Sequence, residues 1–551
     1  MKVAGSYKAM LLLAVILSLA GEAAWSQDAR YKYWIGFSGP KSVQYSISRP
    51  EEFLTDRAIE RRNNQGIAVD ESDIPVSRAM VDSLKAMGGE VLMTSRWFNA
   101  AAVASGDSLF LGKLLRKSWV ANAELVYQSI VAPATAAEGP QVAKADMPAL
   151  LYGSSERQIT LMNGKTLHDQ NLRGQGMVIA VLDAGFYMAD TLSAFDSLRT
   201  NGQILGYRDF VDPGGNLFIQ SSHGMSVLSL MGGNVPGELV GTAPGASYWL
   251  LRSEDVSSEW RIEEVNWLAA AEFADSVGAD IINSSLGYSL FDDPSEDHSY
   301  ADMDGKSTLV SRAAQMASNK GILVVNSAGN SGNSAWKYII APADAKGVLA
   351  VGAVDTNGMI ATFSSYGPTW DHRIKPNTLA VGLGAEIFLS SNRTGPGFGT
   401  SFASPLIAGM AACLWQKFPL VTSEEIKTAI EQSSNLYDRP DDQYGYGIPD
   451  FMVAENIVSG IYNERAPGGG SGLVYPNPCT DHIYIRVPGT VTGSVQVSIF
   501  DLSGRLSFEA VLEVPPTGTV MIQGLDRLQS GYYLVDVRIN GSGSRYKLLK
   551  L

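Results

Sequence analysis

The stretch GTSFASP, residues 399–405, stands at the start of a long apolar segment. Apolar residues follow on nearly every side from Phe402 to Leu414, which predicts a helix that is buried all round. Ser401 then has two interpretations: it is the N-cap of this helix, or it is a nucleophile held at the helix start. The N-cap is the more common role for a serine in this place, and Pro405 fits a first helical turn. The choice depends on whether a histidine and an aspartate are placed to act on Ser401.

The bulk composition is that of a globular protein with several domains. The chain has 551 residues, of which 45% are hydrophobic and 18% charged, so two to four domains are expected. The formal net charge is −14 at pH 7, and no block of Lys or Arg is long enough to form a phosphate-binding patch. Nucleic acid is therefore not an expected partner.

The first residues have the pattern of a secretory signal peptide. Lys2 and Lys8 precede the apolar run MLLLAVILSLAG, and the small residues Ala24 and Ser26 come before Gln27. A membrane anchor is the alternative, but about a dozen apolar residues fall short of the roughly 20 that span a bilayer. We therefore expect a signal peptide over residues 1–26 and export of the remainder.

Two cysteines, Cys413 and Cys479, lie far apart in the sequence and do not form a disulfide framework. Cys413 falls within the apolar helix and is expected to be a small buried hydrophobic residue. A catalytic thiol is disfavoured there, because an apolar helix does not stabilise a thiolate.

The N-terminal block, residues 27–128, is predicted to be an α+β domain. A strand is expected at 31–39. A helix is expected at 51–62, with Ser48 and Glu51 as a capping box and Gly66 as its end. A second helix at 77–89 and a strand at 90–104 follow. Residues 129–154, rich in Ala and Pro, are predicted to be an exposed and cleavable connector.

The central block, residues 155–458, alternates strands and helices. Short β-branched runs at 177–182, 279–286, 321–329 and 347–354 predict parallel strands that are buried on both faces. Between them, one helical pattern runs from Ile262 to Phe273 and ends before Gly278, and another runs from Leu309 to Ala317 and ends before Gly321. The fold class is therefore α/β, with a doubly wound and mainly parallel sheet.

The C-terminal block begins after a glycine-rich linker at residues 459–472. Residues 473–551 contain short segments in which apolar and polar residues alternate, separated by turns such as LSGR and NGSG. This pattern predicts a small β-sandwich.

Two polar residues follow predicted strands of the central sheet, where the chemistry of open α/β sheets is found. Asp183 comes directly after the strand at 177–182, and Asn330 comes after the strand at 321–329. Of the five histidines, His223 alone stands at the start of an apolar helix. Taken singly, Asp183 and Asn330 are equally well explained as turn residues. Taken together, Asp183, His223 and Ser401 supply an acid, a base and a nucleophile.

Asp183, His223 and Ser401 occur in the chain order of the subtilisin-type triad. Over roughly residues 155–455 the sequence resembles the subtilisin-like serine proteases. Ala184 departs from the family pattern, which usually has Ser or Thr after the aspartate, and this is expected to alter how Asp183 is held. The resemblance rests on the motifs VLDAG at 181–185, HGMSV at 223–227, GTAPGA at 241–246, INSSLG at 282–287, NSAGN at 326–330 and GTSFASP.

The resemblance implies a secreted endopeptidase that acts on extracellular proteins or peptides. Ser401 would be the nucleophile, His223 the general base, and Asp183 the group that orients the imidazole. The Asn330 side chain and the Ser401 backbone N–H would form the oxyanion hole. Two segments would bind the substrate backbone: Ser285, Leu286 and Gly287, and Ser327, Ala328 and Gly329.

Side-chain selection and metal binding are further expectations of the resemblance. Ile340 would lie near the floor of the main side-chain pocket and favour apolar substrate residues. No cofactor is needed for the chemistry, but structural calcium is often bound in this family. Asp302 and Asp304 in the acidic stretch 291–305 are the candidate ligands, although a solvated acidic loop fits them better, because the twelve-residue EF-hand spacing is absent.

The flanking blocks have resemblances of their own. Residues 27–128 resemble the prosegments that inhibit these proteases, with an independent binding domain as the alternative. The motifs YPNP at 475–478 and DLSGR at 501–505 resemble those of C-terminal domains sorted by the type IX secretion system. This resemblance implies secretion to the surface or surroundings of a gram-negative bacterium, with the type IX machinery as a partner.

Two other functions are considered. A catalytically inactive binding protein that keeps the protease fold would be indicated by the loss of a triad residue, and none is lost. An α/β-hydrolase would need a G-x-S-x-G elbow and the order Ser, Asp, His, neither of which occurs in the required form.

Overall fold

The computed structural model describes residues 30–129, 152–465, 474–475, 479–486, 494–514, 519–539 and 542–550. The predicted signal peptide, most of the connector and residues 466–472 of the predicted linker lie outside this part of the chain. The described residues form two compact units. The first contains residues 30–48, 70–129 and 260–265, and the second contains all the others.

The first unit is built on a four-stranded antiparallel sheet with the order β2-β3-β1-β4. Tyr33, Ile35 and Phe37 alternate along β1 and pack against Leu84 and Phe110. The stretch 90–104, predicted as one strand, is instead a hairpin, because the chain turns at Asn99 with φ 49°. The elements are β1 (Arg30–Phe37), α3 (Arg78–Ala86), β2 (Glu90–Ser95), β3 (Ala100–Ser105), α4 (Phe110–Leu114) and β4 (Val120–Ser129).

The helix α2 (Asp56–Asn64) belongs to the second unit and begins later than predicted. The capping box of Ser48 and Glu51 is wrong: the Ser48 hydroxyl lies 2.9 Å from that of Ser46, and a separate turn of 3₁₀ helix covers Pro50–Glu52. The N-cap is Thr55, whose side chain accepts a hydrogen bond from the backbone N–H of Ala58.

The centre of the second unit is a parallel seven-stranded sheet with the order β13-β12-β11-β10-β5-β9-β6. The four predicted strands are confirmed, and every residue of β5, β10, β11 and β12 is buried, as expected of strands covered on both faces. The strands are β5 (Val178–Asp183), β6 (Ile204–Asp209), β9 (Ser247–Arg252), β10 (Ile281–Ser284), β11 (Leu323–Ser327), β12 (Val348–Val354) and β13 (Thr378–Val381).

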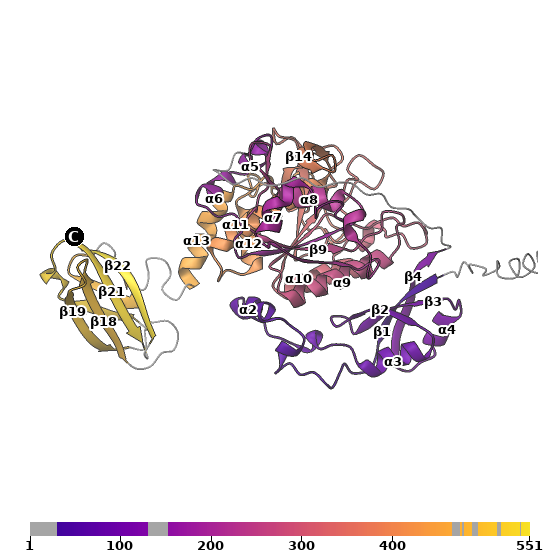
Figure 1. The fold of residues 1–551 in the computed structure, drawn as a ribbon, viewed down its shortest axis with the longest axis horizontal. Helices are drawn as coiled ribbons and strands as arrows, with labels where there is room; N and C mark the ends of the chain where they lie inside the picture. Colours follow the sequence, from indigo (N-terminus) through magenta and orange to yellow (C-terminus); the bar gives the residue numbers. More distant parts are fainter. Residues whose placement is uncertain are drawn as a thin grey trace, which may run out of the picture. The chain divides into compact units, whose positions relative to one another are not determined.

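Helices cover both faces of this sheet, which confirms the doubly wound α/β fold. On one face, α8 (His223–Gly232) and α11 (Thr400–Lys417) pack together and share a core with β5, β11 and β12. On the other face, α9 (Ile262–Val277) and α10 (Leu309–Asn319) lie side by side (Figure 1). Smaller elements complete the domain: α5 (Glu156–Thr160), α6 (Lys165–Asp169), α7 (Asp196–Thr200), β7 (Asn234–Val235), β8 (Leu239–Val240), β14 (Leu383–Leu389), β15 (Arg393–Phe398), α12 (Ser423–Gln432) and α13 (Phe451–Arg465).

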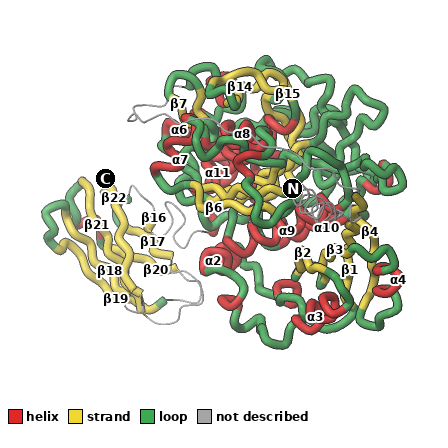
Figure 2. Tube along the Cα trace, turned by 45° about the vertical axis from the view of Figure 1, so that its right-hand side comes forward, coloured by secondary structure: helices red, strands yellow, loops and turns green. Residues whose placement is uncertain are grey.

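The C-terminal domain consists almost entirely of strands and loops (Figure 2). Two antiparallel sheets, β16-β17-β20 and β19-β18-β21-β22, share one core, to which Ile483 and Ile522 contribute from the first sheet and Val497 and Val535 from the second. The β-sandwich prediction is thus confirmed. The strands are β16 (Val474–Tyr475), β17 (His482–Arg486), β18 (Ser494–Asp501), β19 (Leu506–Glu513), β20 (Thr519–Gln523), β21 (Gly531–Ile539) and β22 (Ser542–Lys550). No helix within the described ranges combines the length and apolar character needed to cross a bilayer.

Candidate active site

The carboxyl ends of three neighbouring strands bring the candidate residues to one edge of the central sheet. Asp183 is the last residue of β5, Ser285 follows β10 directly, and Asn330 follows β11. His223 is the first residue of α8, and Ser401 is the second residue of α11. All except Asp183 line one cleft, whose cavity volume is about 310 Å³.

Asp183 and His223 form a hydrogen-bonded pair at the side of this cleft. The distance from His223 Nδ1 to Asp183 Oδ1 is 2.8 Å, and the backbone N–H of Ala184 donates to the same Oδ1 at 2.8 Å. Asp183 Oδ2 is buried and has no hydrogen-bond partner among the described residues. The family pattern has a hydroxyl-bearing residue at position 184, where this chain has Ala184. In its absence, Asp183 Oδ2 has no donor among the described residues.

The charge environment raises the pKa of His223. Burial acts to lower this pKa, but the charge of Asp183 and its hydrogen bond outweigh that effect, and Glu254 adds a smaller contribution of the same sign as Asp183. The ring also packs against Phe402, with 5.7 Å between the ring centroids. The imidazole is therefore held in place on two sides.

Ser401 is not the cap of α11. The helix begins at Thr400, and the N-cap is Gly399, which has no side chain to accept from the first N–H groups of the helix. The Ser401 hydroxyl donates to the backbone carbonyl of Ser285 at 3.2 Å. Nucleophilic attack requires this hydroxyl to donate to His223 instead, so it would have to leave the Ser285 carbonyl. Catalytic hydrogen bonds are often long or misaligned in sites without substrate.

Pro405 lies in the second turn of α11, so the prediction of a first-turn proline is wrong. A proline there has no N–H to donate to the carbonyl four residues earlier, which is that of Ser401. The hydroxyl of Ser285 takes over this role and donates to the Ser401 carbonyl at 2.8 Å. The start of α11 is thus joined to the end of β10 through two hydrogen bonds.

Asn330 is oriented by Thr400. Its Oδ1 accepts hydrogen bonds from the backbone N–H of Thr400 at 2.9 Å and from the Thr400 hydroxyl at 3.1 Å. The side-chain NH₂ is therefore left to donate into the cleft that Asn330 lines.

The cleft walls contain five of the six residues predicted to bind substrate. They are Ser285, Leu286, Gly287, Ser327 and Gly329. Ala328 does not line the cleft, because it is fully buried, its N–H donates to Val351 and its carbonyl accepts from Ile340.

Ile340 lines the cleft beside two glycines. A Cβ atom at Gly287 would come within 2.6 Å of the Ile340 side chain, and one at Gly329 within 3.0 Å. The space between the two walls therefore exists because both positions lack a side chain, and Ile340 gives it an apolar surface.

Glu254 lines the same cleft and was not predicted from the sequence. It follows the carboxyl end of β9, the neighbour of β5, so the rule that selected Asp183 would also have found it if β9 had been recognised as a strand. Burial first, and then the charges of Glu259 and Asp183, raise the pKa of the Glu254 carboxyl to about 8. No hydrogen bond or ion pair to this carboxyl occurs in the part of the chain that the structure describes.

The other candidate groups have local roles. The Cys413 thiol donates to the carbonyl of Thr242 at 3.1 Å and burial raises its pKa, so it does not act as a thiolate. Asp302 accepts hydrogen bonds from Ser299, and Asp304 accepts from the N–H groups of the next turn. Within the described ranges, no group of three or more His, Cys, Asp or Glu side chains is placed to hold a metal ion, and calcium binding by this chain stays a prediction.

A hydrogen-bonded Asp–His pair and a serine at a helix start, joined in one cleft with an amide donor, are the elements of a serine peptidase site.

Three family models match the chain. That of the Subtilase family matches residues 174–447, that of the Peptidase S8 propeptide domain of Bacteroidota matches residues 32–141, and that of the secretion system C-terminal sorting domain matches residues 473–550.

Curated relatives agree with this assignment. The thermostable alkaline protease of Halalkalibacterium halodurans is 30% identical over 291 residues, which are 53% of this chain and 70% of that protein. Serine protease AprX of Bacillus subtilis is 30% identical over 321 residues, 53% of this chain and 68% of that protein. Subtilisin NAT of Bacillus subtilis subsp. natto is 27% identical over 380 residues, 68% of this chain and 85% of that protein.

The chain belongs to the subtilase family and is a serine endopeptidase. It carries a propeptide domain before the peptidase and a sorting domain after it, so it is made as a precursor and is directed to the cell surface or beyond. The resemblances stated from the sequence motifs are thereby confirmed.

Proposed function

We propose that the protein hydrolyses peptide bonds in extracellular proteins through Asp183, His223 and Ser401, by way of an acyl-enzyme. The observation that carries this proposal is the 2.8 Å hydrogen bond between Asp183 and His223, the histidine that lines the same cleft as Ser401. In the first half-reaction, the Ser401 oxygen attacks the scissile carbonyl carbon while His223 Nε2 takes the hydroxyl proton. The C–N bond then breaks as His223 gives that proton to the leaving amine.

In the second half-reaction, a water molecule repeats these steps on the acyl-enzyme. His223 takes a proton from the water, the resulting oxygen attacks the ester carbon, and His223 returns the proton to Ser401. Asp183 acts by holding Nδ1 of the ring, which keeps Nε2 as the basic atom and stabilises the imidazolium in both halves. The chemistry needs no cofactor, because this chain supplies the base, the nucleophile and the donors.

The oxyanion hole is assigned to the Asn330 side-chain NH₂ and the Ser401 backbone N–H. The first is turned away from Thr400 by the two hydrogen bonds to Asn330 Oδ1. The second lies in the first turn of α11, where N–H groups have no partner within the helix and the helix dipole favours negative charge. Ser285 to Gly287 and Ser327 with Gly329 would bind the substrate backbone, and Ile340 would contact an apolar substrate side chain.

The test is cleavage of a peptide library by the processed enzyme, with and without a serine-directed phosphonate. We expect cleavage after a restricted set of residues, its loss after phosphonate labelling of Ser401, and no cleavage by Ser401→Ala. Asn330→Ala should lower kcat far more than it alters KM; in subtilisin, from which the figure comes, loss of such a donor costs about 10²–10³ in kcat. Full activity of Ser401→Ala would refute the mechanism. A correctly folded wild-type enzyme that cleaves no peptide would favour the inactive binding protein instead.

The flanking domains are assigned to regulation and export. The propeptide domain is proposed to inhibit the enzyme by covering the substrate cleft, and the C-terminal domain to engage the type IX secretion machinery of a gram-negative bacterium after the signal peptide has directed the chain to the periplasm. Added in trans, residues 27–128 should inhibit the processed enzyme competitively with peptide. If a large excess of residues 27–128 gives no inhibition, this segment would be an independent binding domain instead.

A further inference from the structure

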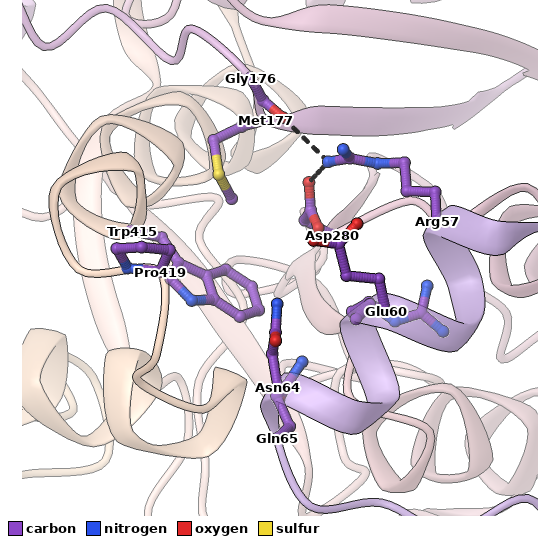
Figure 3. Close-up of a pocket in the computed structure, with 10 residues that line it drawn as sticks. Arg57, Glu60, Asn64, Gln65, Gly176, Met177, Asp280, Trp415 and Pro419 are labelled. Carbon is purple, nitrogen blue, oxygen red and sulfur yellow. Dashed lines mark hydrogen bonds and ion pairs between the residues drawn. The ribbon is translucent and has the colours of Figure 1, made fainter. Parts of the chain in front are cut away.

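Residues 49–69 lie within the stretch matched by the propeptide model, yet they belong to the unit that holds the peptidase. We call them the arginine clasp, because Arg57, Arg61 and Arg62 of α2 make its main contacts. Arg57 donates from Nε to the carbonyl of Gly278 at 2.9 Å and from a terminal nitrogen to the carbonyl of Gly176 at 2.9 Å. The same side chain forms an ion pair with Asp280 (Figure 3).

Arg61 and Arg62 share one buried carboxylate. Arg61 lies 2.5 Å from Asp275 Oδ1 and Arg62 lies 2.7 Å from Asp275 Oδ2, and the three side chains are 3%, 1% and 0% exposed. Arg61 also donates to the carbonyls of Ala279 at 2.6 Å and Lys320 at 3.3 Å. Buried ion pairs need further hydrogen bonds to their charged groups, and the two carbonyls supply such bonds to Arg61.

Neutral contacts at both ends of α2 complete the clasp. Thr55 donates from its backbone N–H and its hydroxyl to the carbonyl of Ser276, at 3.0 and 2.9 Å. Gln65 donates to the carbonyl of Gly321 at 2.7 Å and accepts from the N–H of Ser423 at 2.9 Å. A cavity of about 180 Å³ remains between α2 and Met177, Trp415 and Pro419 (Figure 3).

Most of these carbonyls lie at the C-terminal ends of α9 and α10. Such ends expose carbonyls without helical partners and carry partial negative charge, so cations and donors bind there. Each helix is followed by a glycine with positive φ, Gly278 at +80° and Gly321 at +86°. A Cβ at Gly278 would lie 2.7 Å from Arg57 Cγ, and one at Gly321 would lie 2.8 Å from Gln65 Nε2. The clasp therefore rests directly on both helix ends.

The charge of Asp275 is compensated by the clasp. Asp275 lies in the last turn of α9, where the helix dipole disfavours a negative charge and which itself contains no basic residue. The two guanidinium groups of α2 supply the compensation. A carboxylate at this position is thus explained by its partners on the clasp.

We propose that the C-terminal ends of α9 and α10, with Asp275 and Asp280, form an exosite for the arginine clasp. By exosite we mean a binding surface of the peptidase outside the substrate cleft; none of its residues lines that cleft. The clasp folds with the peptidase and anchors the prosegment there. This attachment does not depend on the triad, and after cleavage of the connector it continues to hold the clasp.

Hydrogen exchange in the full chain tests the proposal without any need for activity. In the Ser401→Ala chain, increasing urea should expose the amides of residues 56–65 together with those at the ends of α9 and α10, and not with those of β1 and β3. Adding Arg61→Ala and Arg62→Ala should lower the protection of residues 56–65 at least tenfold. The matched control Arg78→Ala, which removes an exposed arginine of α3, should leave this protection unchanged.

A second measurement follows the clasp after processing. In the active wild-type chain, mass spectrometry of the peptidase fraction from size exclusion should find residues 49–69 with the peptidase after phosphonate labelling of Ser401. The double arginine variant should lose them. Exchange of residues 56–65 in step with β1 and β3, or a labelled wild-type peptidase free of residues 49–69, would overturn the exosite. Should the double variant fail to fold, the wild-type results alone decide.

Discussion

The imidazole of His223 determines the acid side of the pH profile, because only a neutral ring can accept the proton of Ser401. Its pKa is raised above the ordinary 6.5, since the charge and hydrogen bond of Asp183 outweigh the effect of burial. Activity should therefore fall as the pH drops through a value above 6.5 and return as the pH rises. The measurement is the acid limb of kcat/KM, and a midpoint below pH 6.5 would contradict the assignment.

Glu254 gives the cleft a charge that depends on pH. Its carboxyl, with a pKa of about 8, is faced by Glu259, Asp183, His223 and Asp255, and it becomes ionised mainly between pH 7 and 9. A substrate lysine remains charged over this range, because its pKa is about 10.4. We expect the preference for Lys over Met peptides, measured as a ratio of kcat/KM, to rise about two- to fivefold between pH 7 and 9.

The variant Glu254→Gln separates this charge from the shape of the cleft. It keeps the size of the side chain and should show a ratio that does not change with pH. Half-buried Asp255, the neighbour of Glu254, provides the control, and Asp255→Asn should retain the rise. An equal rise in wild type and Glu254→Gln would show that another group recognises the cation.

At the scale of elements, the link between β10 and α11 can be tested by two substitutions. Ser285→Ala removes the donor to the Ser401 carbonyl and leaves a buried acceptor unpaired, which should lower the free energy of unfolding by about 1–3 kcal/mol. Pro405→Ala supplies a backbone N–H that can donate to this carbonyl from within the helix. The double variant should therefore recover part of the loss in thermal unfolding, and strictly additive effects would contradict the compensation.

The regular elements were predictable where one local pattern dominated. The buried strands of the central sheet are continuous apolar runs, and α9 and α10 end at glycines, so their type and approximate bounds could be read directly. The prediction failed where tertiary contacts decide the outcome. Thr55, not Ser48, caps α2, and the hairpin in 90–104 depends on a turn at Asn99 with left-handed backbone geometry.

The sequence predicts which residues form the site better than it predicts how they are arranged. The chain order and the motifs identify Asp183, His223, Asn330 and Ser401, because each falls at a strand or helix end. They do not reveal that Ala328 is buried behind the cleft wall. Glu254 was missed because β9, the strand that it follows, was not among the four strands predicted from the sequence.

At the scale of the whole molecule, α13 determines where the peptidase can be truncated. The helix continues to Arg465, into the segment predicted as linker, and Tyr462 packs against Phe418 with 5.4 Å between the ring centroids. A chain that ends at Arg465 should mature and cleave peptide in vitro like the full chain. A chain that ends at Gly460 loses Tyr462 and should melt at a lower temperature, measured by calorimetry; equal melting of the two would contradict this role of α13.

The same truncation at Arg465 tests the sorting domain in the cell. Without residues 466–551 the protease should remain in the periplasm, because the secretion signal is missing. Fused to a signal-bearing fluorescent protein, those residues should carry it to the cell surface or the medium. Normal export of the truncated protease would show that this domain is not the secretion signal.

The cleft draws its parts from separate stretches of chain. Ile340 and the two glycines beside it lie on loops that contribute neither Asp183 nor His223, and Ser401 stands on a helix of its own. A substitution at position 340 can change the size of the side-chain pocket without disturbing the hydrogen bond between base and acid. Gene duplicates of such an enzyme can therefore diverge in substrate specificity while they keep one reaction. Selection can act on the pocket and on the chemistry as independent traits.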